Sequence, residues 1–467
     1  MKQIRVLFPA AAAVAGLGAC SNGHALPENT KPNIIFILAD DMGIGDVEPY
    51  GGKMIETPNI SRLAQDGMLF THHYSGSTVS APSRCALMTG MDMGHAWIRG
   101  NAGTASGFDS ALRPEDVTVA EILKAQGYAT GCVGKWGLGG PDSQGRPGLQ
   151  GFDYFCGYLS QGAAHNYYPD YLYENNEEVY LGGEVYSHFY IMEHGLQFMK
   201  EHINEPLFMY FAITPPHADL DYPDISHYDG KFEEVPWVNN PKSGRGYKSN
   251  PKPRATYASM VSEIDKNVGM VIDLLEKEGK LDNSIIIFSS DNGVHHVGGH
   301  DPDYFNSNGP FRGYKRDLYE GGIRTPFIVR WPGVVKPGST TDCITTFWDF
   351  LPTVCDIVGA KTPDKIQGIS YLPTLLGQKQ KRTHSYIYYE FYEQGGKQSV
   401  MTTKDGWKLV RLNMNNPDKI VEELYNINDD IAEEHNRIKE FPEKADALRE
   451  LAGYARTESE LFKWKNK

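Results

Sequence analysis

In the stretch 33–41, NIIFILADD, residues 33–39 are a nearly continuous run of β-branched and aliphatic residues, and two aspartates follow them. A run of this kind is typical of a strand buried on both faces, as in a parallel sheet. Strands that alternate with helices predict an α/β fold with a mainly parallel sheet, whose ligands bind at the carboxyl ends of the strands. Further strand patterns occur at 207–213, 284–290 and 326–330, and helical patterns at 57–65, 117–126, 253–277 and 347–358.

The pattern changes after about residue 382. Short strand patterns at 385–391, 399–403 and 407–412 surround a Lys-Asp-Gly turn, which predicts a small antiparallel sheet. A helix from about 442 to 457 closes the chain. We therefore expect a main domain at 32–382 and a C-terminal subdomain, made of the small sheet plus this helix, at 383–467.

Composition places the chain among globular proteins. Of its 467 residues, 40% are hydrophobic and 22% are charged, which argues against disorder, and the length allows two or three domains. The net charge of −14 excludes nucleic acid as an expected partner and gives no general attraction for an anionic substrate. An anionic ligand would need local positive groups. Beyond residue 20, no CxxC pair occurs, so we predict neither a disulfide framework nor a zinc site from Cys85, Cys132, Cys156, Cys343 and Cys355.

The first twenty residues are typical of an export signal. Lys2 and Arg5 precede an apolar run at 6–19 that is too short to span a membrane. The run ends in Leu-Gly-Ala before Cys20, which resembles a bacterial lipoprotein signal, and ordinary cleavage with Cys20 unmodified is the alternative. The lipoprotein prediction places the protein in the periplasm or on the cell surface of a Gram-negative bacterium, held to the membrane through a lipid anchor only. The expected parts are a signal peptide at 1–19 and a tether, beginning with lipidated Cys20, at 20–31.

Oxygen-bearing side chains follow two of the predicted strands. Asp40 and Asp41 follow the first strand, and Asp291 and Asn292 follow the strand at 284–290. Because parallel strands end at the same edge of a sheet, these groups could converge on one point. Carboxylates this close need a cation, and oxygen ligands select Ca²⁺ or Mg²⁺. The alternative is that these residues merely begin turns after strands.

The segment 80–90, SAPSRCALMTG, predicts a helix with a polar start. Pro82 suits the first helical position, Ser80 would lie at or just before the N-cap, and Gly90 suits the C-terminal stop. A group at Ser80 would lie where the helix dipole and free N–H groups favour negative charge. An ordinary serine cap would have the same sequence.

Five motifs, taken in order, resemble the formylglycine-dependent sulfatases of the alkaline phosphatase superfamily. The resemblance spans roughly residues 32–412, and the Ser-x-Pro-Ser-Arg-x-x-x-x-Thr-Gly motif is its most specific part. It implies a large mixed, mainly parallel sheet of the alkaline-phosphatase type, flanked by helices, with 32–382 as the catalytic domain. The motifs are Pro-Asn-Ile with Asp-Asp-Met-Gly at 32–43, Thr-Pro-Asn-Ile at 57–60, the serine motif at 80–90, Gly-Lys-Trp at 134–136 and Asp-Asn-Gly at 291–293.

The resemblance implies a catalytic nucleophile made from Ser80. In the family, the first residue of this motif is oxidised to formylglycine (3-oxoalanine), whose hydrate attacks sulfur. A serine here is similar to the substrates of an anaerobic sulfatase-maturating enzyme, which is therefore an expected partner. An unmodified serine could be sulfated but could not expel sulfate by collapse to an aldehyde.

The resemblance also implies one Ca²⁺ and several positive groups. Arg84 would hold the formylglycine, and Lys135 and Lys315 would bind sulfate. His217 would lie beside the leaving-group oxygen, and His217 or Lys315 would protonate the departing alcohol. The Ca²⁺ ligands would be Asp40, Asp41, Asp291, Asn292 and modified Ser80, with a sulfate oxygen.

One position departs from the family pattern. The family usually reads Gly-Lys-Trp-His-Leu-Gly, whereas this chain has Gly137 in place of the histidine. A histidine expected near the formylglycine hydroxyl is therefore missing. His165 is the first candidate to replace it, because it follows in a loop with other polar and aromatic groups.

Polar and aromatic clusters around these motifs suggest a sugar substrate. The His-x-x-x-Arg-Gly-Asn, His-Asn-Tyr-Tyr-Pro and Glu-Gly-Gly stretches resemble exported carbohydrate sulfatases of glycan-degrading Bacteroidetes. The resemblance implies a sulfated glycan, with galactose or N-acetylgalactosamine sulfated at the 4- or 6-position favoured. The candidate substrate-binding residues are His95, Arg99, His165, Asn166, His295 and His300.

Two other functions remain open on the sequence alone. A phosphoester hydrolase of the same superfamily would use two zinc ions and more histidine ligands. A sulfated-glycan-binding lipoprotein without turnover would retain the pocket, and the departure at Gly137 is its best support.

Overall fold

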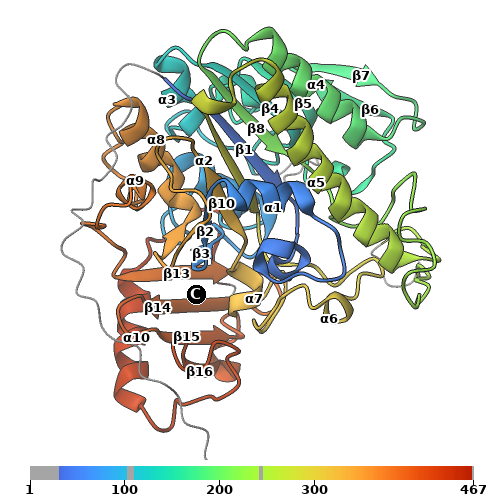
Figure 1. The fold of residues 1–467 in the computed structure, drawn as a ribbon. Coiled ribbons are helices and arrows are strands. Elements are labelled where there is room, and N and C mark those ends of the chain that lie inside the picture. The colour runs from blue at the N-terminus through green and yellow to red at the C-terminus, as the bar shows by residue number, and fades with distance from the viewer. Residues whose placement is uncertain (1–30, 102–109, 241–245, 465–467) are drawn as a thin grey trace, which may run out of the picture.

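A ten-stranded sheet with the order β11-β2-β10-β9-β1-β8-β4-β5-β6-β7 forms the centre of the protein (Figure 1). The computed structural model describes residues 31–101, 110–240 and 246–464, so the predicted signal peptide and Cys20 lie outside the described residues. The strands are β1 (Asn33–Ala39), β2 (Met68–Phe70), β4 (Ala129–Lys135), β5 (Tyr154–Tyr158), β6 (Tyr171–Glu174), β7 (Glu177–Tyr180), β8 (Leu207–Ala212), β9 (Ser284–Ser290), β10 (Phe327–Arg330) and β11 (Ser339–Thr341). A two-stranded sheet pairs β3 (His73–Tyr74) with β12 (Thr345–Thr346).

The five adjacent strands β9, β1, β8, β4 and β5 run parallel, while β10, β6 and β7 pair antiparallel with their neighbours. The sheet is therefore mixed and mainly parallel, which confirms the predicted fold class. In the register of β1 and β9, Ala39 pairs with Ser290. The aspartates that follow these two residues consequently leave the sheet at matched positions.

Alternate residues of β1 pack into two separate cores. Phe36 and its neighbours on one face contact α2 (Ser80–Thr89), α3 (Val119–Ala125) and α8 (Phe350–Val358), whereas Ile35 and Ile37 face α1 (Pro58–Gln65), α4 (Ser187–Glu201) and α5 (Pro253–Lys277). Figure 1 shows these two helical layers on opposite sides of the sheet. This double burial explains why β1 is apolar along its whole length. The short helices are α6 (Pro302–Phe305), α7 (Glu320–Ile323) and α9 (Leu372–Leu375).

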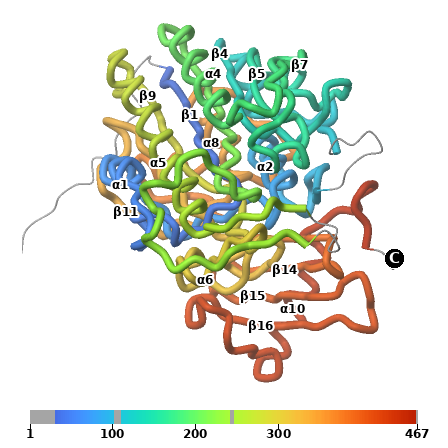
Figure 2. The backbone as a smooth tube through the Cα atoms, turned by 90° about the vertical axis from the view of Figure 1, so that its right-hand side faces the viewer, coloured from blue at the N-terminus to red at the C-terminus, as the bar shows by residue number. Residues whose placement is uncertain are grey.

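The C-terminal region forms a separate antiparallel sheet, as predicted (Figures 1 and 2). Its strands are β13 (Tyr386–Phe391), β14 (Lys397–Thr402), β15 (Trp407–Leu412) and β16 (Val421–Asn426), and α10 (Pro442–Tyr454) packs on it. Buried Lys408 of β15 binds Glu320 and Glu433, each at 2.9 Å. This buried charge cluster joins the Glu-Gly-Gly stretch of the main domain to the C-terminal sheet.

No helix within the described ranges is long and apolar enough to cross a membrane. Each cysteine in these ranges is a free thiol.

Candidate functional site

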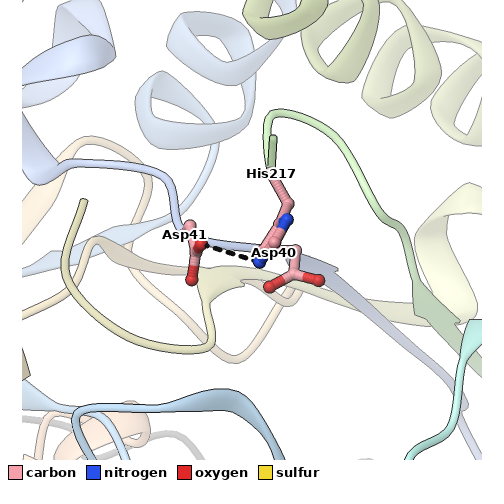
Figure 3. Close-up of side chains that lie close together, drawn as sticks. All are labelled: Asp40, Asp41 and His217. Carbon is pink, nitrogen blue, oxygen red and sulfur yellow. Dashed lines mark ion pairs between the residues drawn. The ribbon is translucent and has the colours of Figure 1, made fainter. Parts of the chain in front are cut away.

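Two consecutive aspartates leave the central strand β1. Asp40 and Asp41 are fully buried, and the φ angle of Asp41 is 64°, a conformation that is uncommon for residues other than glycine. The backbone N–H of Asp41 donates to Oδ1 of Asp291 at 3.1 Å, and that of Met42 donates to Oγ of Ser290 at 2.9 Å. These bonds to the end of β9 fix the turn, so that both carboxylates lie beside His217 (Figure 3).

Strand β9 brings a third carboxylate and an amide to the same point. Asp291 and Asn292 are fully buried, and Nδ2 of Asn292 donates to Oδ1 of Asp41 at 2.7 Å. Oδ1 of Asn292 is also buried and has no hydrogen-bond partner among the described residues. A buried amide oxygen without a partner, beside three buried carboxylates, fits a hard divalent cation such as Ca²⁺ or Mg²⁺. The structure thus brings together the four side chains predicted as oxygen ligands.

Histidine contributes little to this candidate metal site. Within the described part of the chain, one group of acidic and histidine side chains has ligand atoms within 4.8 Å of one another, and it consists of Asp40, Asp41 and His217. Two zinc ions would call for more nitrogen ligands than this single imidazole offers. The donor set therefore favours one oxygen-seeking cation.

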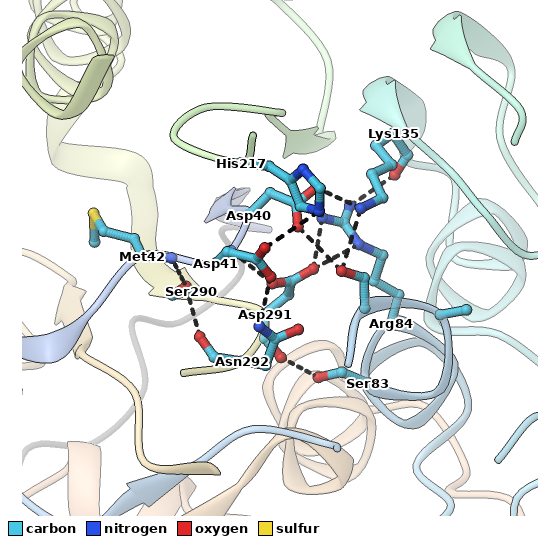
Figure 4. A network of polar contacts seen from close by, with 12 residues as sticks. Asp40, Asp41, Met42, Ser83, Arg84, Lys135, His217, Ser290, Asp291 and Asn292 are labelled. Atoms are coloured by element: carbon cyan, nitrogen blue, oxygen red, sulfur yellow. Dashed lines mark hydrogen bonds and ion pairs between the residues drawn. The ribbon is translucent and has the colours of Figure 1, made fainter. Parts of the chain in front are cut away.

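Three buried cations face the three carboxylates, and Figure 4 shows two of them, Arg84 and Lys135. They come from separate elements: Arg84 from α2, Lys135 from the end of β4, and Lys315 from the loop before α7. The contacts are Lys135 Nζ to Asp40 Oδ2 at 2.5 Å, Lys315 Nζ to Asp41 Oδ2 at 2.6 Å, and Arg84 Nη2 to Asp291 Oδ2 at 2.9 Å. Each negative charge has its own positive neighbour.

The pKa shifts of the three carboxyl groups differ in direction. Burial alone would raise the pKa of each. At Asp40 and Asp41 the lysine charges outweigh burial, so the pKa of both groups lies below the usual range. At Asp291, burial and the charge of Asp40 raise the pKa to about 6. A bound divalent cation would favour the ionised form of all three.

Ser80 lies at the centre of this cluster. Its Oγ donates to Oδ1 of Asp40 at 3.0 Å and accepts from Nζ of Lys135 at 3.2 Å. The helix begins at Ser80 itself with Val79 as N-cap, so the prediction that Pro82 occupies the first helical position is wrong. Proline fits at the third position because the first N–H groups of a helix have no intrahelical partner. The Ser80 hydroxyl is instead directed into the charge cluster, where it contacts Asp40 and Lys135.

His217 follows β8 and contacts Lys315. Nε2 of His217 lies 3.1 Å from Nζ of Lys315, and Nδ1 contacts the carbonyl oxygen of Ala218. Burial and the charge of Lys315 hold the pKa of His217 well below its ordinary value. With its proton on Nδ1, the neutral imidazole accepts from the Lys315 ammonium at Nε2.

Comparison with known proteins identifies the family of this site. The sulfatase family matches residues 32–360, and the C-terminal region of N-sulphoglucosamine sulphohydrolase matches residues 310–455. The chain belongs to the sulfatase family. It is a sulfuric ester hydrolase.

Individual sulfatases resemble the chain over most of its length. An N-acetylgalactosamine-6-O-sulfatase of Bacteroides thetaiotaomicron is 29% identical over 98% of this chain and 100% of its own. Human N-acetylgalactosamine-6-sulfatase is 30% identical over 74% of this chain and 66% of its own. The solved structure of Ps i-CgsB in complex with k-i-k-neocarrahexaose has a TM-score of 0.76 and 28% identity, and the match covers 94% of both chains.

In this sulfatase, two of the six predicted substrate-binding residues line a cavity beside the charge cluster. Half-buried His165 stacks on His217, with ring centroids 4.4 Å apart, and exposed Asn166 follows it. His295 is buried behind His217 and contacts the carbonyl oxygen of Pro216 at 3.1 Å. These positions bring His165 and Asn166 to the cavity and leave His295 behind the site.

The other three predicted substrate-binding residues have structural partners. His300 is buried and stacks on Tyr257, with ring centroids 3.5 Å apart. His95 pairs with Asp92 at 2.6 Å. Arg99 is buried and bound to Glu390 of β13 at 2.8 Å, so it holds the main domain to the C-terminal sheet. Their nearness to the motifs in sequence does not bring these side chains to the cavity lining.

The side chain of Gln161 fills the space beside Gly137. The sequence did not point to Gln161 as a residue of the site. The φ angle of Gly137 is 70°, and a Cβ atom there would lie 1.7 Å from Nε2 of Gln161. Gln161 is buried, with 6% of its surface exposed. Its amide thus occupies the direction in which the family histidine would project, while His165 lies against His217. No motif marks Gln161, because the pairing arises only when the loop after β5 folds over the end of β4.

We expect Gly137→His to be more destabilising than the same change at Gly230. Gly230 has a similar φ of 75° but has no atom within 4 Å of its Cβ direction, so it carries the backbone strain alone. Left-handed backbone strain costs about 1–2 kcal/mol, and forcing Gln161 aside should add about 1–3 kcal/mol. Urea titration measures both free energies of unfolding. Equal losses of unfolding free energy at the two positions would show that the Gln161 side chain moves aside at no cost. Adding Gln161→Ala to Gly137→His should remove the difference between the two positions and leave the backbone strain.

Proposed function

We propose that this sulfatase removes sulfate from galactose or N-acetylgalactosamine residues of glycans, using formylglycine made from Ser80. One observation carries the proposal: the hydroxyl of Ser80 lies between Asp40 and Lys135 in a buried charge cluster, and a cavity adjoins that cluster where its lining residue His165 stacks on His217. Two relatives named N-acetylgalactosamine-6-sulfatases support this sugar and the 6-position, with the 4-position as the alternative.

The residues present fit one Ca²⁺ held by the three carboxylates and Oδ1 of Asn292. When bound, Ca²⁺ would supply Lewis-acid stabilisation of charge on the sulfuryl oxygens. Formylglycine at position 80 would supply a hydrated aldehyde in place of the weakly nucleophilic serine hydroxyl.

The chain's own cations perform the electrostatic part of the reaction. Lys135 reaches position 80 directly, and Lys315 approaches from the opposite carboxylate, so both can contact a sulfate ester placed between them. Arg84 is one helical turn after Ser80 and is fixed by Asp291 and by the carbonyl oxygen of Lys135 at 2.7 Å. Charges fixed in this way stabilise the developing charge of a transition state without reorganising.

Lys315 and His217 form the proton-donating pair for the departing sugar alcohol. His217 is neutral and accepts from Lys315, so the ammonium of Lys315 is the proton source and His217 orients or relays that proton. His165 stacks on the far side of His217 and limits its rotation.

Export and maturation complete the proposal. The apolar run at 6–19 and Cys20 support an exported lipoprotein of a Gram-negative bacterium, anchored through lipid alone. A serine at position 80 supports activation by an anaerobic sulfatase-maturating enzyme. The substrate partner is a sulfated glycan.

The first prediction from this proposal concerns residue 80. When the protein is produced with an anaerobic maturating enzyme, the tryptic peptide 63–84 should lose about 2 Da, because a hydroxyl becomes an aldehyde. Matured protein should release sulfate from N-acetylgalactosamine 6-sulfate, and Ser80→Ala should lower kcat by at least about 10³-fold. Release of phosphate but not sulfate would favour the phosphoester alternative. Ligand binding by fully matured protein without sulfate release would favour the binding-protein alternative.

A second prediction separates proton donation from binding. His217→Ala should lower kcat/KM for a sugar sulfate by about 10²–10⁴-fold, because a sugar alkoxide needs a proton as it leaves. The same variant should lose far less on 4-nitrophenyl sulfate, whose phenolate leaves without one. Steady-state assays on the two substrates check this, and equal losses on both would contradict a role in protonation.

A further inference from the structure

A cavity of about 840 Å³ opens beside the catalytic centre. This volume lies within the range of pockets that hold drug-sized ligands. His165 connects the cavity to the centre, since it lines the cavity and stacks on His217. Other side chains of the lining are Tyr158, Tyr171, Tyr173, Asp219 and Arg316.

Arg316 is fixed in position by its backbone. It directly follows Lys315, and its φ angle is 78°, a left-handed conformation that is strained for arginine. Its N–H donates to the carbonyl oxygen of Thr78 at 3.1 Å, close to the start of α2, and its own carbonyl accepts from Lys397 at 2.7 Å. Because of this bend, two consecutive side chains point in different directions. Lys315 reaches the catalytic centre, and Arg316 lines the cavity.

The guanidinium of Arg316 has no ion pair with a carboxylate in the described ranges, and its Nε is buried without a hydrogen bond. The adjacent carboxylate of Asp317 is already bound by Lys397 at 2.7 Å. By contrast, the buried guanidinium of Arg84 binds Asp291, and that of Arg99 binds Glu390. A partly buried guanidinium without a protein partner is suited to an anion supplied by the ligand, because its planar fork matches carboxylate and sulfate oxygens.

The cavity also contains two carboxylates, which restrict where a second anion can bind. Asp170 and Asp219 both line it, and neither forms an ion pair with Arg316. Oδ1 of Asp219 accepts the backbone N–H of Lys248 at 2.8 Å. These carboxylates would repel an anion but can accept bonds from sugar hydroxyls. An anionic group is therefore directed to the Arg316 side of the cavity.

We propose that Arg316 determines specificity by binding a second anionic group of the glycan, a carboxylate or a further sulfate. The scissile sulfate would occupy Lys135 and Lys315, which leaves Arg316 for this second group. This inference rests on the proposed glycan sulfatase activity.

The test compares matured protein on three oligosaccharides: one with the scissile sulfate alone, one with an added uronic acid carboxylate, and one with an added second sulfate. The native chain should favour one of the two doubly charged substrates by at least about 10-fold in kcat/KM, as expected for a charge-assisted hydrogen bond. The doubly charged substrate that is preferred shows whether Arg316 binds a carboxylate or a sulfate.

Arg316→Gln should lose about 10–100-fold in kcat/KM on the preferred substrate and should be unchanged on the singly sulfated one. Arg316→Lys should fold and retain part of the preference, because it keeps the charge without the fork. Arg382→Gln is the matched control: it removes the same charge from an exposed site and should change nothing.

Two results would overturn the inference. One is that the native chain has no preference among the three substrates, and the other is that Arg316→Gln and Arg316→Lys lose equally on all three. Absence of turnover of every substrate by fully matured native protein would instead contradict the proposed function itself, and the inference would fall with it.

Discussion

Three carboxylates are buried together at one edge of the sheet, and the elements around them bring positive charges to the same place. Asp40, Asp41 and Asp291 are each fully buried, and like charges at this separation repel strongly in a low-dielectric interior. One cation contacts each carboxylate: Arg84 of α2, Lys135 of β4, and Lys315 of the loop before α7. The central strands and helix α2 are held together by these ion pairs as well as by their apolar faces.

The same compensation explains how an acidic protein can bind an anion. The net charge of −14 belongs to the whole chain, whereas the three cations and three carboxylates of the cluster balance locally. A divalent cation would make the cluster positive. A sulfate ester and an ionised nucleophile would then restore neutrality, so the centre is suited to gather negative charge during the reaction. Under the proposed function, the rest of the glycan would bind in the cavity, where Arg316 supplies a fourth cation.

Much of the fold follows from sequence because its central strands are buried on both faces. β1, β9, β15 and α5 begin and end at the predicted residues. β4 was missed because its sequence, ATGCVGK, contains two glycines and few β-branched residues, and β5 to β7, α4 and β16 were also missed. Tertiary pairing with β8 and β5 makes β4 a strand despite its weak propensity.

The functional site, like the fold, could be predicted from the sequence only in part. The carboxylates could be predicted because they follow strands that must end at one edge, whereas Lys135, Lys315 and His217 depended on resemblance to a family. Arg99 and His300 show the limit of reasoning from nearness in sequence, since both follow site motifs and both serve packing. Gln161 and Arg316 belong to no motif, and only the folded chain places them beside Gly137 and the cavity.

Asp40, Asp41, Asp291 and Asn292 are expected to form one divalent-cation site. Calorimetric titration of chelator-treated protein with Ca²⁺ measures this binding by itself, because it requires neither maturation nor a substrate. We predict one Ca²⁺ per chain, with affinity reduced at least about 10-fold in Asn292→Ala, which removes the unpartnered amide oxygen. Binding of two Zn²⁺ per chain without Ca²⁺ binding, or undiminished Ca²⁺ binding by Asn292→Ala, would show that these four side chains do not form a Ca²⁺ site.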